Sequence, residues 1–250
     1  MDAPAGTDWE WATRTGGALS GAQRRHLAAA LARAVPGLLA ARATRAIGRT
    51  GAGRLEFEGL RIPDSALARA AELQARESLS IHVLEHSYRT YFFGRVLADL
   101  DGARVDDELV YVACLLHDLC LEQPTPGRCF AVSGGVAAVE FALREGVEPD
   151  RAATIGAAIA AHITPGVAAD LNDPGGFVSA GASVDVIGSR IGELDRDWVD
   201  ELLTRHPRHE LKRHLIAAFD AEAKAVPHGR SKLLVTAGFN QMIRFAPFTE

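Results

Sequence analysis

The hydrophobic positions of the chain recur at helical spacing along almost its whole length. Alanine, leucine, arginine and glutamate dominate, and long alternating runs of valine, isoleucine and threonine do not occur. Pro36-Gly37 should interrupt the first helix, and Gly102 should end the third. The pattern predicts an all-α protein built as a packed helical bundle. We expect helices near residues 20–45, 63–78, 81–102, 106–119, 133–145, 149–163, 177–192, 196–205 and 208–225.

One glycine-rich segment, "GRTGAGRLEFEGLRIP" (48–63), divides the chain and has only weak strand character. We interpret it as a linker. The predicted organisation is a helical N-terminal extension with its linker over residues 1–60, and a helical bundle over residues 61–250. A long loop, "TPGVAADLNDPGG" (164–176), separates two helices of the bundle. Loops of that length inside compact domains are often functional.

Composition narrows the class of protein. Hydrophobic residues make up 48% of the chain and charged residues 24%, so a sizeable core can form and disorder is excluded. The net charge is -5 and no basic stripe occurs, which argues against a nucleic-acid partner. Three cysteines without C-x-x-C spacing predict free thiols and a cytoplasmic setting. We expect a small-molecule partner and leave association into a homo-oligomer open.

Two segments bear on targeting and membranes. The N-terminus lacks the basic region and apolar core of a secretion signal. The uncharged stretch "TIGAAIAAHITPGVAA" (154–169) is too short and too broken by Pro165 and its glycines to span a bilayer. We therefore expect no membrane partner.

Candidate chemistry lies in polar residues within or at the ends of apolar helices. Each of them alone could be a core residue satisfied by a backbone group. Together they favour one metal site, because a dication offsets the desolvation of all of them at once. The pair in "HVLEH" (82–86) is a weak zinc half-site, and "TRHPRHELKRH" (204–214) is interpreted as a solvated basic face. The residues of the proposed site are His86, His117–Asp118, His162 and Asp185.

Several segments resemble the cyanamide hydratase-like branch of the HD-domain superfamily. The order H…HD…D matches His86, His117–Asp118 and Asp185. The resemblance covers residues 62–190, with a weaker match over 206–219, and leaves the N-terminal sixty residues outside. The segments are "LEHSYRTYFFG" (84–94), "LVYVACLLHDL" (109–119), "GRCFAVSGGVAAVEF" (127–141), "AIAAHITPGVA" (158–168) and "VSAGASVDVIG" (178–188).

The resemblance implies an HD-domain bundle that holds one divalent transition metal. Zinc is the first choice, with iron and manganese as alternatives, and the implied ligands are His86, His117, Asp118 and Asp185. It further implies hydration of a small nitrile to a urea or amide. Zinc brings the pKa of a bound water to about 7, and the hydroxide would attack an electrophilic carbon. His162 is the one histidine between the HD pair and Asp185, so we expect one metal and not two.

Other residues near the motif also have expected roles in the reaction. Asp118 or Asp185 is expected to shuttle the proton. Arg89 would orient Asp118 or bind substrate, a solvated salt bridge being the alternative, and His162 would hydrogen-bond substrate unless it is a plain core histidine. The expected substrate-binding residues are Phe130, Thr164 and Arg128.

At two positions the sequence differs from related families, and these differences help to rank the alternative functions. The run "HDLCLE" (117–122) lacks the lysine of the "HDIGK" type found in many phosphohydrolases, and Ala131 stands where close relatives carry glutamate. A metal-dependent phosphohydrolase ranks second, because it needs cations for phosphate and only Arg89 and Arg128 lie near the motif. A non-catalytic HD protein that uses its metal as a staple ranks third.

Overall fold

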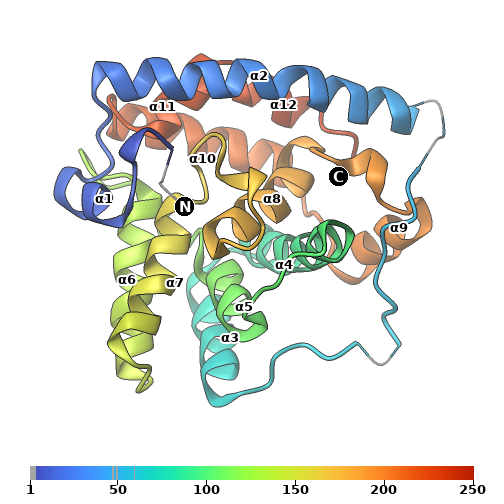
Figure 1. Ribbon diagram of the computed structural model, residues 1–250, viewed down its shortest axis with the longest axis horizontal. Coiled ribbons are helices and arrows are strands. Elements are labelled where there is room, and N and C mark those ends of the chain that lie inside the picture. Colours follow the sequence, from blue (N-terminus) through green and yellow to red (C-terminus); the bar gives the residue numbers. More distant parts are fainter. Residues whose placement is uncertain (1–3, 47, 49, 59) are drawn as a thin grey trace.

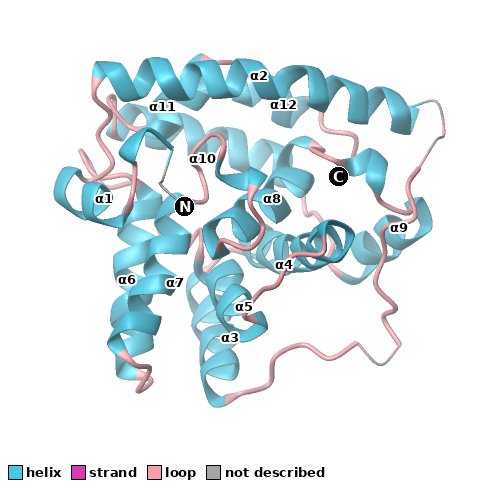
Figure 2. Cartoon of the chain, in the orientation of Figure 1, coloured by secondary structure: helices cyan, strands magenta, loops and turns pink. Residues whose placement is uncertain are grey.

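The computed structural model describes residues 4–46, 48, 50–58 and 60–250, which form helices joined by loops (Figures 1 and 2). Among these residues no strand forms, and only isolated bridges such as Gly53–Leu194 occur outside the helices. The all-α prediction is confirmed. The α-helices are α1 (Trp9–Thr15), α2 (Gly21–Ala46), α3 (Ala66–Ser78), α4 (Ile81–Asp101), α5 (Asp107–Leu116), α6 (Phe130–Arg144), α7 (Pro149–Ala161), α8 (Pro174–Ile187), α9 (Arg196–Arg205), α10 (Leu211–Ala225), α11 (Arg230–Thr236) and α12 (Phe239–Arg244), with short 3-10 turns at Pro4–Gly6, Val167–Ala169 and Ile191–Glu193.

Helix α4 lies at the centre of the bundle (Figure 1). It packs along α8, and α5 contacts it as well, while α6 and α7 form a second close pair. Helix α2 runs along the top of the molecule in this view, above α10, α11 and α12 (Figure 1). The chain thus has a central helix surrounded by others, which suits a buried site on α4.

The apolar core consists of two clusters. The larger cluster joins α3, α4, α5 and α8 and includes Val83, Leu115 and Phe177. The smaller cluster joins the N-terminal helices to α6 and to the C-terminal helices and includes Trp11 and Leu27. Residues 4–46 are therefore helical, as expected, and packed into the fold. The division of the chain at residue 60 stays a prediction.

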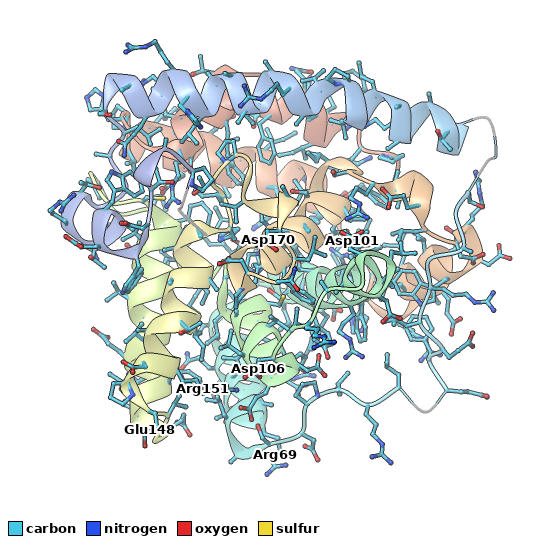
Figure 3. The ribbon with its side chains drawn as sticks, in the orientation of Figure 1. Arg69, Asp101, Asp106, Glu148, Arg151 and Asp170 are labelled. Atoms are coloured by element: carbon cyan, nitrogen blue, oxygen red, sulfur yellow. The ribbon has the colours of Figure 1, made fainter. Side chains whose placement is uncertain are left out.

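Helix α5 carries the His-Asp pair at its C-terminal end and is anchored at its start. The Asp106 carboxylate accepts a hydrogen bond from the Leu109 backbone N–H at 3.1 Å, which caps the first turn. Asp106 also pairs with Arg151 of α7, and Figure 3 shows both side chains at the lower edge of the bundle. His117 is the C-cap residue, so the pair lies in the turn that follows the helix.

Several predicted helix boundaries are wrong for local reasons. Helix α2 continues through Pro36, which is exposed, so water can satisfy the carbonyl that loses its partner. Helix α8 begins at Pro174, because Asp173 accepts from two following backbone N–H groups, and it ends at Gly188, where φ is 71°. Helix α10 begins at Leu211, and the sequence pattern did not predict α11 or α12.

Within the described residues, one helical segment meets the length and hydropathy of a membrane span. It is Gly21–Thr44 in α2, with a mean hydropathy of 1.2, and 11% of its apolar window is buried. The expectation of no membrane partner was based on residues 154–169 and did not consider this alanine-rich helix. That expectation stays a prediction.

The close approach of α4 and α8 depends on Gly181. A Cβ at this position would lie 2.0 Å from the Thr90 carbonyl oxygen of α4. We expect Gly181→Ala to force the two helices apart and lower the free energy of unfolding by about 1–3 kcal/mol, measured by urea denaturation. The matched control is Gly37→Ala in α2, where a Cβ meets nothing within 4 Å. That change should be stabilising by about 0.5–1 kcal/mol. Equal effects of the two changes would contradict this interpretation of the packing.

Candidate metal centre

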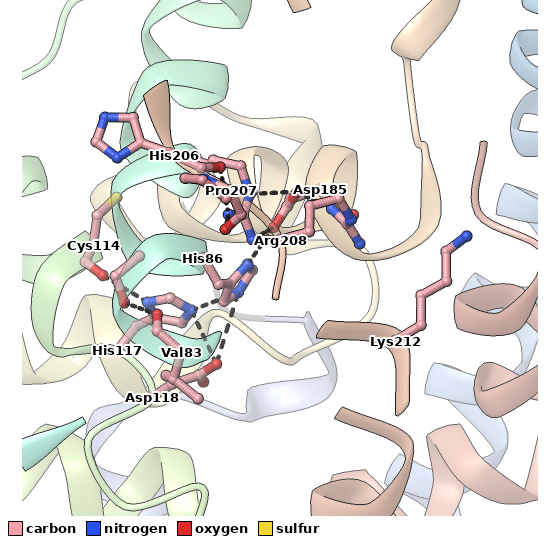
Figure 4. A network of polar contacts seen from close by, with 12 residues as sticks. Val83, His86, Cys114, His117, Asp118, Asp185, His206, Pro207, Arg208 and Lys212 are labelled. Atoms are coloured by element: carbon pink, nitrogen blue, oxygen red, sulfur yellow. Dashed lines mark hydrogen bonds and ion pairs between the residues drawn. The ribbon is translucent and has the colours of Figure 1, made fainter. Parts of the chain in front are cut away.

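Three of the four predicted ligands converge at the end of α5. The His86 and His117 Nε2 atoms are 3.2 Å apart, and the Asp118 Oδ2 atom lies 3.3 Å from His117 Nε2 and 3.7 Å from His86 Nε2. All three side chains are buried, and one potential ligand atom from each lies within 4.8 Å of the others. Figure 4 shows them pointing toward one another. This spacing is compatible with a shared cation.

The hydrogen bonds of the outer imidazole nitrogens determine which nitrogens face the cluster. His117 Nδ1 donates to the Cys114 carbonyl oxygen at 2.7 Å, and His86 Nδ1 donates to Asp185 Oδ2 at 2.7 Å. In the neutral rings both Nε2 atoms then present lone pairs to each other. The Asp118 Oδ1 atom is buried without a hydrogen-bond partner. Such a set of acceptors needs a cation or a proton among them.

The surrounding charges act on the protonation of these groups. Burial lowers the pKa of His86. Burial alone would also lower the pKa of His117. The negative charge of the adjacent Asp118 carboxylate has the opposite effect, and the pKa of His117 is raised. Burial would raise the pKa of Asp118, yet His117 and His162 hold it well below its usual range. A divalent metal would compete with a proton for His117 Nε2, so the metal affinity should fall as the pH falls.

The fourth predicted ligand, Asp185, lies outside this group of ligand atoms. Its carboxylate accepts from Arg89 Nε and Nη2, each at 3.0 Å, and from Arg208 Nη1. Burial would raise the pKa of Asp185, but Arg89 and Arg208 hold it below its usual range. The structure therefore places Asp185 behind His86, where it fixes the ring and its tautomer. This carboxylate–histidine arrangement is common around metals.

A substitution separates an orienting role from a ligand role. We expect Asp185→Asn to keep a metal site whose affinity is about 10- to 100-fold weaker, the usual effect of losing an outer hydrogen-bond partner. Metal titration with a competing chelator would measure the affinity. Complete loss of the metal, with the fold intact by circular dichroism, would show that Asp185 is itself a ligand.

Two of the three roles expected for Arg89, the contact with Asp118 and the solvated salt bridge, do not match its position, while substrate binding stays a prediction. Its side chain is fully buried, so it forms no solvated salt bridge, and its partners are Asp185 and two backbone carbonyls rather than Asp118. Nη1 donates to the carbonyl oxygens of His206 and Pro207 at 2.9 and 2.8 Å. Arg89 thus connects α4, α8 and the loop that precedes α10.

The segment 204–214 is only partly the solvated basic face that its composition predicted. Arg208 is buried and bonds the carboxylate and the carbonyl oxygen of Asp185. The sequence pattern did not identify Arg208 as a residue of the site, since nothing in its spacing distinguishes it from the arginines nearby. His82 lies in the same region, stacked on His214 at 4.4 Å, and not in the cluster.

The buried position of Arg208 predicts a large effect on stability. Arg208→Met should lower the free energy of unfolding by about 3 kcal/mol, because it leaves the buried Asp185 charge with one arginine fewer. Arg213→Met is the matched control, since Arg213 is exposed and forms an ion pair with the exposed Glu210. Its effect should stay within about 1 kcal/mol. Urea denaturation measures both, and similar values would contradict the assigned burial of the ion pair.

A cavity of about 360 Å³ opens beside the cluster and is lined by His86, His117, Asp118, His162 and Thr164, among others. His162 Nδ1 donates to the Ile159 carbonyl oxygen at 2.6 Å, and its Nε2 lies 3.5 Å from Asp118 Oδ1. The structure thus brings His162 to the same site.

The three expected substrate-binding residues lie at different places. Thr164 lines the cavity, and its hydroxyl accepts from the buried Arg230 at 2.7 Å. Phe130 is buried behind His162, with ring centroids 5.7 Å apart, and is not among the lining residues. Arg128 lies in the loop after the HD turn, half-buried, and does not line the cavity either. Contact with substrate therefore fits Thr164 and not the other two.

Comparisons with known proteins bear on the family of the chain. Residues 83–199 match the family model of the HD domain. The chain is similar to the cyanamide hydratases DDI2 and DDI3 of Saccharomyces cerevisiae. Each is 25% identical over 178 residues, which cover 69% of this chain and 79% of the relative. The resemblance to the HD superfamily and its cyanamide hydratase-like branch is thereby confirmed.

Proposed function

We propose that the protein is a metal-dependent enzyme that adds water to a small uncharged carbon–nitrogen compound, in the manner of a cyanamide hydratase. The observation that carries the proposal is the convergence of His86 Nε2, His117 Nε2 and the partly unpartnered Asp118 carboxylate at the wall of a cavity. The similarity to the yeast cyanamide hydratases supports the reaction class.

The proposed metal is zinc, with iron and manganese as alternatives. Two imidazole nitrogens and one carboxylate are a ligand set typical of catalytic zinc, which keeps an open coordination position. When bound, such a metal acidifies a coordinated water and polarises the substrate. The proposed ligands are His86, His117 and Asp118, while Asp185 holds His86 in the tautomer that leaves Nε2 free.

The remaining groups of the site can move the proton that hydration requires. Adding water to a nitrile forms a carbon–oxygen bond and transfers the protons of the water to nitrogen, so a neutral urea or amide results. Asp118 Oδ1 and His162 Nε2 lie 3.5 Å apart at the cavity wall. We assign His162 the transfer of a proton from the attacking water to the substrate nitrogen. Its Nδ1–H is bonded to Ile159, so Nε2 faces the site with a lone pair that can accept the proton from the water and then donate it.

The charges around the cavity favour an uncharged substrate over a phosphate ester. Arg89 and Arg208 are bonded to Asp185, and Arg128 lies outside the cavity lining. Among the lining residues that the structure describes, the one arginine is Arg190, which pairs with Asp101 and Glu193. A phosphate would need cations that are free to bind it.

The cysteines support the proposed cytoplasmic setting. Cys114 and Cys129 are buried, Cys120 is half-buried, and all three are free. Free thiols are the usual state in a reducing compartment.

A substrate panel tests the proposed reaction. Protein loaded with one equivalent of zinc is incubated with cyanamide, other small nitriles, and nucleoside mono- and triphosphates, and urea, amide and phosphate release are measured. We expect metal-dependent urea or amide formation and no phosphate release. Efficient phosphate release with untouched nitriles would reverse the proposal, and a metal-loaded protein inactive on the whole panel would favour a structural metal.

A further inference from the structure

Helix α2 supplies a wall of the cavity beside the metal cluster. Leu31, Val35 and Leu38 recur at helical spacing, and all three line the cavity together with His86, His117 and Asp118. Figure 1 shows α2 crossing the molecule above the C-terminal helices. The N-terminal region, which lies outside the sequence resemblance, therefore contributes directly to the site.

Contacts at both ends hold α2 in this place. Near its start, Leu27 is fully buried, and the preceding Leu19 N–H donates to the His228 carbonyl oxygen at 2.9 Å. Near its end, the Arg42 guanidinium donates to the carbonyl oxygens of Ile187 and Met242 at 2.7 and 2.8 Å. The middle turns are thus fixed at the cavity by contacts near both ends of the helix, two of them to the lining residues Ile187 and Met242, and the wall is built into the fold.

The cavity is larger and more apolar than a small nitrile requires. Besides the α2 residues, its lining includes Leu215, Phe219 and Phe239 of the C-terminal helices. The volume of about 360 Å³ lies within the range of roughly 300–1,000 Å³ seen for pockets that hold drug-sized ligands. Beyond the histidines and Asp118 most lining residues are apolar, so the space favours an apolar group. The polar members of that remaining lining are Thr164, Ser179, Ser183, Ser189 and Arg190.

We infer that the substrate carries an uncharged alkyl or aryl group, which α2 and the C-terminal helices bind while the reacting carbon–nitrogen group faces His86, His117 and Asp118. This inference rests on the proposed function for the reacting group only. The apolar subsite itself can be tested by binding, without turnover.

The test uses straight-chain hydroxamic acids from acetohydroxamic to octanohydroxamic acid, titrated into zinc-loaded and into metal-free protein by calorimetry. Affinity should rise about fourfold for each added methylene until the chain fills the cavity, the usual gain for a buried methylene. Bound zinc should raise the affinity of every hydroxamic acid in the series by a similar factor and leave the dependence of affinity on chain length unchanged. N-alkylcyanamides should show the same trend in kcat/KM.

Two leucines of α2 provide a matched pair of variants. Leu31→Gln places an amide in the cavity wall and should weaken octanohydroxamate binding by about tenfold, while acetohydroxamate changes little. Leu39→Gln makes the same change at a side chain that is 58% exposed and not part of the lining, and should behave as the unmodified protein.

The outcomes separate this inference from the proposed function. Affinity that does not depend on chain length, or equal effects of the two leucine variants, would overturn the apolar subsite even if cyanamide is hydrated. A clear chain-length dependence that Leu31→Gln weakens would support it even if no nitrile is turned over, and in that case only the proposed reaction would fail.

Discussion

Replacing Asp118 by asparagine is expected to remove nearly all bound metal and to lower turnover by about three orders of magnitude or more. Asp118 gives the cluster its only carboxylate among the three converging ligands, and its buried Oδ1 atom has no hydrogen-bond partner. The amide preserves the shape but not the charge that a dication requires. Metal analysis and initial rates on the same preparation measure both effects.

Asp99→Asn serves as the control for this change, because Asp99 is an exposed carboxylate on α4 outside the cavity lining. It should keep full metal content and activity. If Asp118→Asn also kept both, the cluster would not be the metal site.

The second large effect is expected for His162→Ala, which should keep the metal and lose turnover by about 10²–10⁴-fold, the range for a positioned acid–base group. His162 lines the cavity and lies 3.5 Å from Asp118 Oδ1, yet it is not in the group of three close ligand atoms. Metal content and steady-state rates on cyanamide would be measured together.

His228→Ala is the control for that variant, since His228 is exposed and not among the residues that line the cavity. Unchanged turnover in His162→Ala would give this residue a purely structural role. Two metal ions per chain, one of them lost in His162→Ala, would show a dinuclear site instead.

The sequence was sufficient to predict the helical class and most of the site. The apolar run before His117–Asp118 marks a buried helix end, and a buried pair of this kind needs compensation, so a metal could be inferred from local pattern. His86 and His162 followed from the same reasoning. These predictions depend on which positions are buried, and the spacing of hydrophobic residues along the sequence indicates that directly.

The roles of Asp185 and Arg208 could not be predicted in this way. Asp185 was correctly identified as a buried carboxylate in need of a partner, but the partners are arginines from α4 and from the loop before α10. Which arginine meets it is decided by tertiary packing. The contribution of α2 had a readable signal, the spacing of Leu31, Val35 and Leu38, but the expected break at Pro36 concealed it.

The most direct test of the account is anomalous X-ray diffraction from crystals of the zinc-loaded protein, collected on both sides of the zinc absorption edge. We expect one zinc peak per chain, bounded by His86 Nε2, His117 Nε2 and the Asp118 carboxylate, with the Asp185 carboxylate still bonded to Arg89 and Arg208. A protein that binds no zinc at this position, or a peak elsewhere in the chain, would contradict it.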